Sequence, residues 1–207
     1  MLKYSSSYID IIPKEIYSYL NEIYPLMNVI ENKRVFEIGP GPGFHTDLML
    51  TYSPSQIVSI EPDERVATQL TLRYGDRIKV LHEDALLYIK NYDKFDVVVM
   101  FGLLYHFHSP FHLLELVANY NDPEHIFLEI AQNDSDEAGF DDERVNELAQ
   151  RVVKKQYKTI NYCLTFGEKF LEKAMQDLGY VAKVKLRYDE KHSYKSNQVF
   201  YHFEKLS

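Results

Sequence analysis

Strand-like and helix-like segments alternate through the middle of this sequence, and the alternation limits its fold more than any other feature. The strand-like runs are short and rich in β-branched and aromatic residues, and segments of helical length separate them. Five such runs occupy residues 34–38, 56–60, 78–81, 95–101 and 125–130. Because a strand, a helix and a second strand in this order form a βαβ unit, the sequence predicts a mostly parallel sheet covered by helices.

Capping residues mark the ends of the helices between these runs. Asp63 is placed as an N-cap, and Ser109 with Pro110 supplies an N-cap followed by proline in the first helical turn. Thr165 and Glu168 have the spacing of a capping box and predict the start of a late helix. The helices are therefore delimited by local chemistry as well as by periodicity.

The last third of the chain departs from this alternation. Residues 180–188 and 197–204 read as two strands joined by a polar turn, which predicts an antiparallel hairpin at one edge of the sheet. The expected fold is an α/β domain with a seven-strand, mostly parallel sheet and an antiparallel last strand.

Composition removes several classes of protein. The single cysteine, Cys163, cannot form a disulfide within the chain or a thiolate cluster, which favours a reducing, cytoplasmic location. The 23 basic and 31 acidic residues give a net charge of −8, which opposes a broad grip on phosphate backbones and makes nucleic acid an unlikely partner. The longest strongly apolar run, residues 97–104, is far short of the roughly 20 residues that span a bilayer, so no membrane partner is expected.

A glycine-rich loop over residues 37–43 lies directly between a predicted strand and a predicted helix. Gly39, Gly41 and Gly43 allow the backbone to turn sharply and to approach a ligand closely, next to the unpaired N–H groups of a helix N-terminus. Glu61 ends the following strand, where a carboxylate can accept hydrogen bonds from ribose hydroxyls. The alternative, a purely structural turn, remains open, but the placement favours a nucleoside-like ligand.

The spacing of the glycines separates two nucleoside ligands. A dinucleotide-binding loop has the pattern G-x-G-x-x-G, whereas Phe44 stands where its third glycine belongs. Glu37 precedes the first glycine by two residues. An acidic residue followed by G-x-G-x-G resembles the first motif of class I S-adenosylmethionine-dependent methyltransferases, and the resemblance extends from about Arg34 to Glu204.

This resemblance implies a Rossmann-like, doubly wound sheet that binds S-adenosyl-L-methionine and releases S-adenosyl-L-homocysteine. It also implies a domain over residues 34–207, preceded by an N-terminal helical lid segment over residues 1–33. The implied cofactor-binding residues lie at the ends of four strands: Gly39, Gly41 and Gly43 against the cofactor, Glu37 near its amino-acid portion, Glu61 for the ribose, Asp84 and Ala85 for the adenine, and Phe101 and Gly102 beside the methionine and adenine. A simple helix cap is the alternative role of Asp84.

The residues just past the fourth and fifth strands are candidates for the chemistry. His106 is the candidate general base, and Tyr105, Glu129 and Asn133 are the candidate substrate-binding residues. The alternatives are a packing histidine for His106 and a solvated loop for the carboxylate and the amide. A metal site is not expected.

The acceptor is the least constrained part of the interpretation. The Asn-Pro-Pro-Tyr motif used for amino methylation is absent, since Phe101-Gly102-Leu103-Leu104 stands in its place. An acidic segment over residues 134–143 either recognises substrate or forms a solvated face. We expect methyl transfer to an oxygen or nitrogen of a small molecule, by a monomer or homodimer. The alternatives are an RNA such as tRNA, a protein side chain, or a non-catalytic S-adenosylmethionine-binding partner subunit.

Overall fold

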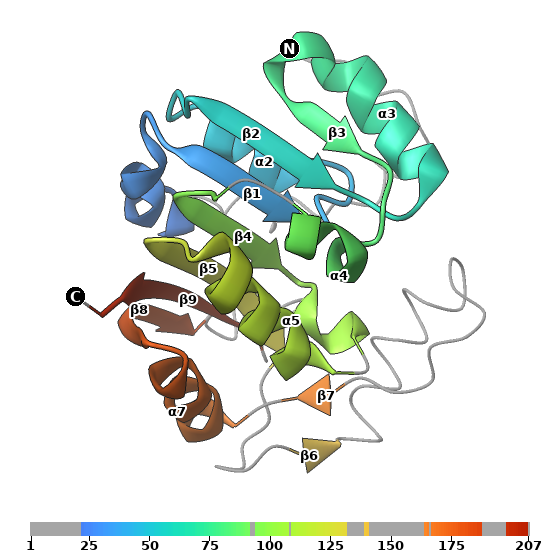
Figure 1. Ribbon diagram of the computed structural model, residues 1–207. Helices are drawn as coiled ribbons and strands as arrows, with labels where there is room; N and C mark the ends of the chain where they lie inside the picture. Colours follow the sequence, from blue (N-terminus) through green and yellow to red (C-terminus); the bar gives the residue numbers. More distant parts are fainter. Residues whose placement is uncertain are drawn as a thin grey trace.

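A seven-stranded sheet forms the centre of the molecule (Figure 1). The computed structural model describes residues 22–91, 94–107, 109–131, 139–140, 164–165, 167–187 and 198–206. The strands of the sheet are β1 (Arg34–Ile38), β2 (Gln56–Ile60), β3 (Lys79–Leu81), β4 (Val97–Phe101), β5 (His125–Ala131), β8 (Tyr180–Arg187) and β9 (Gln198–Lys205). A separate antiparallel pair is formed by β6 (Gly139–Phe140) and β7 (Leu164–Thr165).

The strand order is β3-β2-β1-β4-β5-β9-β8. The first five strands are parallel, and β9 runs antiparallel to both β5 and β8. This confirms the predicted Rossmann-like sheet, including its antiparallel last strand and its hairpin at one edge. Because β1 lies between β2 and β4, the chain reverses direction across the sheet at β1, and this reversal opens a crevice at the carboxyl ends of β1 and β4.

Helices cover both faces of the sheet. In Figure 1, α4 and α5 lie in front of the sheet and α2 lies behind it. Side chains from α4, α5 and α7 belong to one buried apolar cluster, and side chains from α2 and α3 belong to a second cluster on the other face. The bounds are α2 (Phe44–Leu50), α3 (Glu64–Tyr74), α4 (Ala85–Tyr88), α5 (Pro110–Leu116) and α7 (Glu168–Asp177). This double coverage explains why β4 is apolar at every position.

A 3-10 helix, η2 (Tyr24–Ile30), precedes the sheet and packs into the second cluster. Its residues Met27 and Ile30 are fully buried there. Residues 22–30 therefore contribute to the core. Residues 1–21 of the predicted lid segment lie outside the described residues.

Local capping was predicted correctly at one helix and wrongly at another. Asp63 caps α3, because its Oδ1 accepts from the N–H groups of Arg65 (2.9 Å) and Val66 (3.4 Å). The capping box is wrong, since α7 begins after Gly167 with no side-chain cap and Thr165 belongs to β7. The helix whose start Ser109 and Pro110 predict, α5, ends at Leu116 and continues as a π-helix, η6 (Val117–Asn121).

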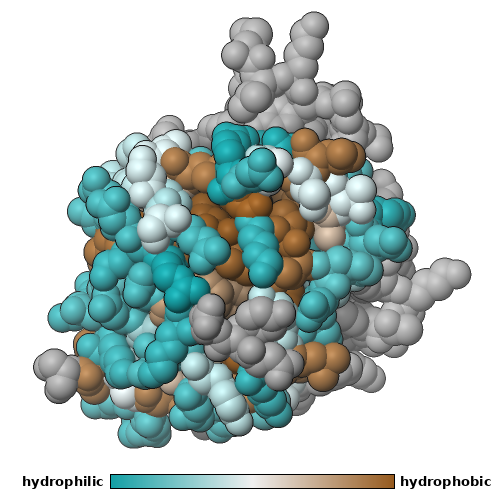
Figure 2. Space-filling view, turned by 45° about the horizontal axis from the view of Figure 1, so that its top comes forward, coloured by the Kyte–Doolittle hydropathy of each residue, from teal (hydrophilic) through white to brown (hydrophobic). Residues whose placement is uncertain are grey.

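The surface turned forward in Figure 2 is mostly hydrophilic around one hollowed apolar area. Among the described residues, no helix combines the length and the apolar character needed to cross a membrane.

Candidate functional site

The glycine-rich loop occupies the crevice at the carboxyl end of β1 and leads directly into α2. Gly39, Gly41 and Gly43 all have positive φ angles, of 70°, 53° and 88°. The Gly39 N–H donates to the carbonyl of Ile60 in β2 (3.0 Å), and the Gly43 N–H donates to the carbonyl of Pro40 (3.0 Å). The loop is thus fixed at both ends by main-chain hydrogen bonds.

The three glycines differ in the space around them. A Cβ on Gly39 would lie 2.6 Å from Leu103 Cδ1, and a Cβ on Gly43 would collide with the Tyr74 hydroxyl. A Cβ on Gly41 would meet no atom within 4 Å. Packing therefore explains the first and third glycines, whereas the middle glycine borders open space of the kind that a ligand can fill.

Glu37 lies beneath this loop and is only 2% exposed. Its carboxylate accepts hydrogen bonds from Thr46 Oγ1 in α2 (2.8 Å to Oε2) and from Ser59 Oγ in β2 (2.6 Å). Burial raises the pKa of Glu37 to about 7, although the two hydroxyl donors oppose this rise. The group is therefore poised to gain or lose a proton near neutral pH.

Glu61 follows β2 and lies beside the same loop, 6% exposed. Its Oε1 accepts from the N–H of Asp63 (3.0 Å), and its carboxylate also accepts from the N–H of Gly41. Burial raises the pKa of Glu61 above its usual value. The structure thus joins Glu61 to the glycine loop, which the sequence only suggested by spacing.

Asp84 is exposed after β3 and starts α4. Its Oδ1 accepts from the N–H of Leu86 (2.7 Å), so the carboxylate caps the helix, and the next residue, Ala85, is buried. The alternative role considered for Asp84, a helix cap, is present. A contact with adenine stays a prediction.

A second group of polar side chains meets at the carboxyl ends of β4 and β5. The Gly102 N–H, just after Phe101, donates to the carbonyl of Glu129 (2.9 Å). A Cβ on Gly102 would lie 3.2 Å from Tyr105 Oη and 3.7 Å from Glu129 Oε1. The absence of a side chain at Gly102 therefore leaves room beside its backbone for a phenol hydroxyl and a carboxylate.

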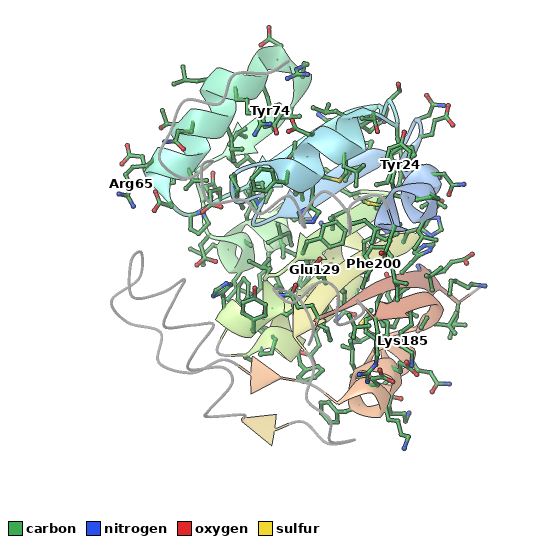
Figure 3. The ribbon with its side chains drawn as sticks, turned by 180° about the vertical axis from the view of Figure 1, so that it is seen from behind. Tyr24, Arg65, Tyr74, Glu129, Lys185 and Phe200 are labelled. Atoms are coloured by element: carbon green, nitrogen blue, oxygen red, sulfur yellow. The ribbon has the colours of Figure 1, made fainter. Side chains whose placement is uncertain are left out.

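Glu129 is only 1% exposed, and it is directly opposite Phe200 of β9 in the sheet register (Figure 3). The Phe101 ring packs 5.9 Å from Phe200 and 4.4 Å from the His45 ring of α2. The carboxylate thus lies among aromatic rings. Such a mixture of apolar walls and few polar groups is typical of small-ligand sites.

His106 lies in the 3-10 turn η5 (Leu104–His106), and its ring packs 4.5 Å from that of Tyr105. Burial lowers the pKa of His106 below its usual value, so the imidazole is neutral at neutral pH and can accept a proton. Asn133, Cys163 and the acidic segment 134–143, apart from the two residues of β6, lie outside the described residues. Among the side chains that the structure describes, no three His, Cys, Asp or Glu residues gather as a metal site.

Sequence reasoning missed the support of the loop by α3. Arg73 Nη1 donates to the carbonyl of Pro42 (2.7 Å), and the Tyr74 hydroxyl donates to the carbonyl of Gly43 (2.7 Å; Figure 3). Arg73 also pairs with Asp47 in α2. No sequence motif marks these residues, because they meet the loop only through the packing of α3 against α2.

The family model described as ribosomal RNA adenine dimethylase matches residues 14–119, about half of the chain. The matched region includes the glycine loop, Glu61, Asp84 and the turn that carries Tyr105 and His106.

Curated relatives share shorter regions. A ribosomal RNA small subunit methyltransferase A from Bradyrhizobium diazoefficiens is 37% identical over 62 residues, which cover 28% of this chain and 22% of that protein. A tRNA U34 carboxymethyltransferase from Campylobacter jejuni is 30% identical over 114 residues, which cover 53% of this chain and 39% of that protein. The chain therefore spans well under half the length of the curated relatives it matches.

A solved structure shares the whole fold. The N-methyltransferase NodS from Bradyrhizobium japonicum, in complex with S-adenosyl-L-homocysteine, superposes with a TM-score of 0.68 at 12% identity, covering 95% of this chain and 90% of that one. Together with the family match, this establishes that the chain belongs to the ribosomal RNA adenine dimethylase family, within the class I S-adenosylmethionine-dependent methyltransferases.

Proposed function

We propose that this protein transfers a methyl group from S-adenosylmethionine to an RNA. The observation that carries the proposal is the match of residues 14–119 to a family of RNA methyltransferases, since this region contains the glycine loop and the turn with Tyr105 and His106. The names of the curated relatives, which act on ribosomal RNA and on tRNA, support the same acceptor class. They favour an RNA acceptor, the alternative expectation, over a small-molecule acceptor, although the net charge of −8 opposes a broad grip on a phosphate backbone.

The glycine loop fits S-adenosylmethionine. Open space at Gly41 admits a ligand against the backbone, and the Glu61 carboxylate at the edge of that space suits the two hydroxyls of a ribose. The carboxylate of Glu37, held by Thr46 and Ser59, suits the ammonium of the cofactor's amino-acid portion. Asp84 and Ala85 are proposed for the adenine, and Phe101 and Gly102 for the border between adenine and methionine.

When bound, the cofactor supplies a methyl group already activated on a sulfonium, so the protein mainly has to position the acceptor. Glu129 and Tyr105 both lie beside Gly102 and are proposed to hold the acceptor group. His106 is neutral at neutral pH and is proposed to take the proton of an acceptor hydroxyl or amine. Because no Asn-Pro-Pro-Tyr motif is present, the adenine amino chemistry named in the family description requires a different set of acceptor contacts here.

Gly41→Ala is expected to weaken binding of S-adenosylhomocysteine about tenfold, because the added methyl fills the space proposed for the ligand. The change in φ preference alone costs roughly 1–2 kcal/mol of folding stability. Gly75→Ala is the matched control, since Gly75 has a φ of 55° against 53° at Gly41 and its Cβ also meets nothing within 4 Å. Isothermal titration calorimetry on both variants, with urea unfolding beside it, separates ligand exclusion from backbone strain. Equal affinities of the two variants for S-adenosylhomocysteine would show that the cofactor does not bind against Gly41.

The proposed function is tested by transfer of a tritium-labelled methyl group from S-adenosylmethionine. The acceptors are total RNA and the small-molecule extract, both prepared from cells in which this gene is deleted. We expect ribonuclease-sensitive label in the RNA fraction. Glu61→Ala is expected to lower cofactor affinity roughly ten- to a hundredfold, equivalent to about 1.5–3 kcal/mol for lost charge-assisted hydrogen bonds, and to reduce labelling at subsaturating cofactor accordingly. Label confined to the small-molecule extract would refute the RNA assignment and restore the small-molecule acceptor.

A further inference from the structure

Gln198 carries a polar atom for which the described part of the chain supplies no hydrogen-bond partner. The residue begins β9 and is 6% exposed, yet among the described residues its Oε1 is one of the few buried side-chain atoms without a hydrogen-bond partner. A buried acceptor without a donor opposes folding, because it has lost its water and gained nothing in exchange. Such an atom calls for a partner beyond the residues that the structure describes, and a bound ligand is one such partner.

The sheet register places Gln198 near the part of the site that is proposed for the methyl acceptor. Gln198 is opposite Ala131, the last residue of β5, and Phe200 is opposite Glu129. Since side chains alternate along a strand, Gln198 is on the same face of the sheet as Phe200 and Glu129. Gln198 and Glu129 are diagonal neighbours across an antiparallel pair, a separation within the reach of long side chains.

The surroundings restrict the kind of group that fits. His45 packs on Phe101 and Tyr105 on His106, so aromatic rings flank the carboxylate of Glu129. A glutamine amide offers an oxygen that accepts and a nitrogen that donates, side by side. This pair matches the edge of a planar nucleobase, where an N–H lies next to a ring nitrogen or a carbonyl.

We infer that Gln198 is a substrate-binding residue that recognises the N–H edge of the target nucleobase through its Oε1. The inference rests on the proposed RNA acceptor. It adds that the protein recognises this RNA through the N–H edge of the target base. Two hydrogen-bond acceptors, Gln198 Oε1 and the Glu129 carboxylate, then accept hydrogen bonds from N–H groups of the same base. Aromatic rings beside them provide the apolar surface for its planar faces.

Asn121 provides a matched control within the same chain. Its side-chain amide is fully buried, and both of its polar atoms lack a hydrogen-bond partner among the described residues. It ends η6, just before β5 begins, and therefore lies at the opposite end of β5 from the candidate site. Replacement of either amide by an apolar side chain of similar size removes an unsatisfied buried group, so neither variant is expected to lose folding stability.

The test uses nucleosides as probes on protein saturated with S-adenosylhomocysteine. Ligand-observed NMR measures the affinities of uridine and 3-methyluridine, and of adenosine and N6,N6-dimethyladenosine; the second member of each pair lacks the base N–H. For at least one pair, we expect the wild type to bind the N–H form about tenfold more tightly. Gln198→Met is expected to abolish this preference, whereas Asn121→Leu keeps it.

Two results would overturn the inference. One is a wild type that binds no nucleoside or does not distinguish the methylated forms, and the other is a preference that survives in Gln198→Met. Urea unfolding of both variants shows that any loss of preference does not come from loss of the fold. The outcome is separate from the transfer assay: a nucleobase preference without RNA labelling refutes the proposed function alone, and RNA labelling with an unchanged preference in Gln198→Met refutes the role of Gln198 alone.

Discussion

Gly43→Ala is expected to lower the free energy of unfolding by about 2–3 kcal/mol. A φ of 88° is unfavourable for alanine by roughly 1–2 kcal/mol, and the new Cβ would collide with the Tyr74 hydroxyl. Tyr74 cannot move aside freely, because it is 3% exposed and its ring lies beneath the guanidinium groups of Arg73 (4.9 Å) and Arg77 (5.3 Å). Its displacement also loses the hydrogen bond to the Gly43 carbonyl, worth about 1 kcal/mol.

Urea unfolding of three variants separates these contributions. Gly179→Ala has the same φ of 88° in open space, so it is expected to cost only the backbone strain of roughly 1–2 kcal/mol. Tyr74→Phe removes the hydroxyl with which the new Cβ collides. In the Gly43→Ala background, Tyr74→Phe is therefore expected to lower the free energy of unfolding by less than it does in the wild type. If Gly43→Ala and Gly179→Ala lose equal stability, or if the two changes at 43 and 74 are additive, the collision plays no part.

The sheet and the glycine loop were predictable because their determinants are local. The apolar run of β4 and the placement of Gly39 to Gly43 between a strand and a helix can be read from neighbouring residues. Glu61 was predictable because βαβ units have a nearly fixed length, which sets the distance in sequence from the loop to the end of the next strand.

The partners of these residues were not predictable, because they depend on how distant elements pack. Thr46 and Ser59 bind the Glu37 carboxylate from two different elements, and no spacing rule links the three. Tyr74 belongs to the apolar face of α3, and only the contact of α3 with α2 gives its hydroxyl a role at the loop. Gln198 was missed because the antiparallel pairing of β5 and β9, across more than 60 residues of sequence, decides which end of the sheet it reaches.

A pair of histidines, the buried His202 and the half-buried His125, lies at the opposite end of β5 from the candidate site. His202 Nε2 is 3.1 Å from His125 Nδ1, and the His202 ring stacks on Phe127 at a centroid distance of 4.5 Å. The pKa of His202 is lowered from 6.5 to about 4, chiefly by burial; the neighbouring His125 and Lys183 contribute to this lowering, and Glu204 opposes it. Burial lowers the pKa of His125 as well.

Acid is therefore expected to destabilise the protein through this pair. Between pH 6.5 and about 4, the unfolded chain binds a proton at position 202 that the folded protein does not, so the free energy of unfolding falls as the pH falls. The difference between a pKa of 6.5 and one of about 4 corresponds to about 3–4 kcal/mol, and this stabilisation is fully present above pH 6.5. Urea unfolding measured from pH 4.5 to pH 7.5 gives the slope directly.

His202→Gln removes the titrating ring and keeps a polar side chain, so the pH slope in this window is expected to flatten. His82→Gln is the control, because His82 is an exposed histidine after β3 and is distant in the sheet order from β5 and β9. A slope that flattens equally in both variants would mean that histidine content, rather than this pair of histidines, sets the acid sensitivity. A pH slope that is unchanged in His202→Gln would mean that groups other than His202 cause the acid sensitivity. The buried carboxyls Glu37 and Glu61 are not such groups, because their contribution has the opposite sign. Their raised pKa values make the folded state bind more protons than the unfolded chain, which stabilises the fold as the pH falls.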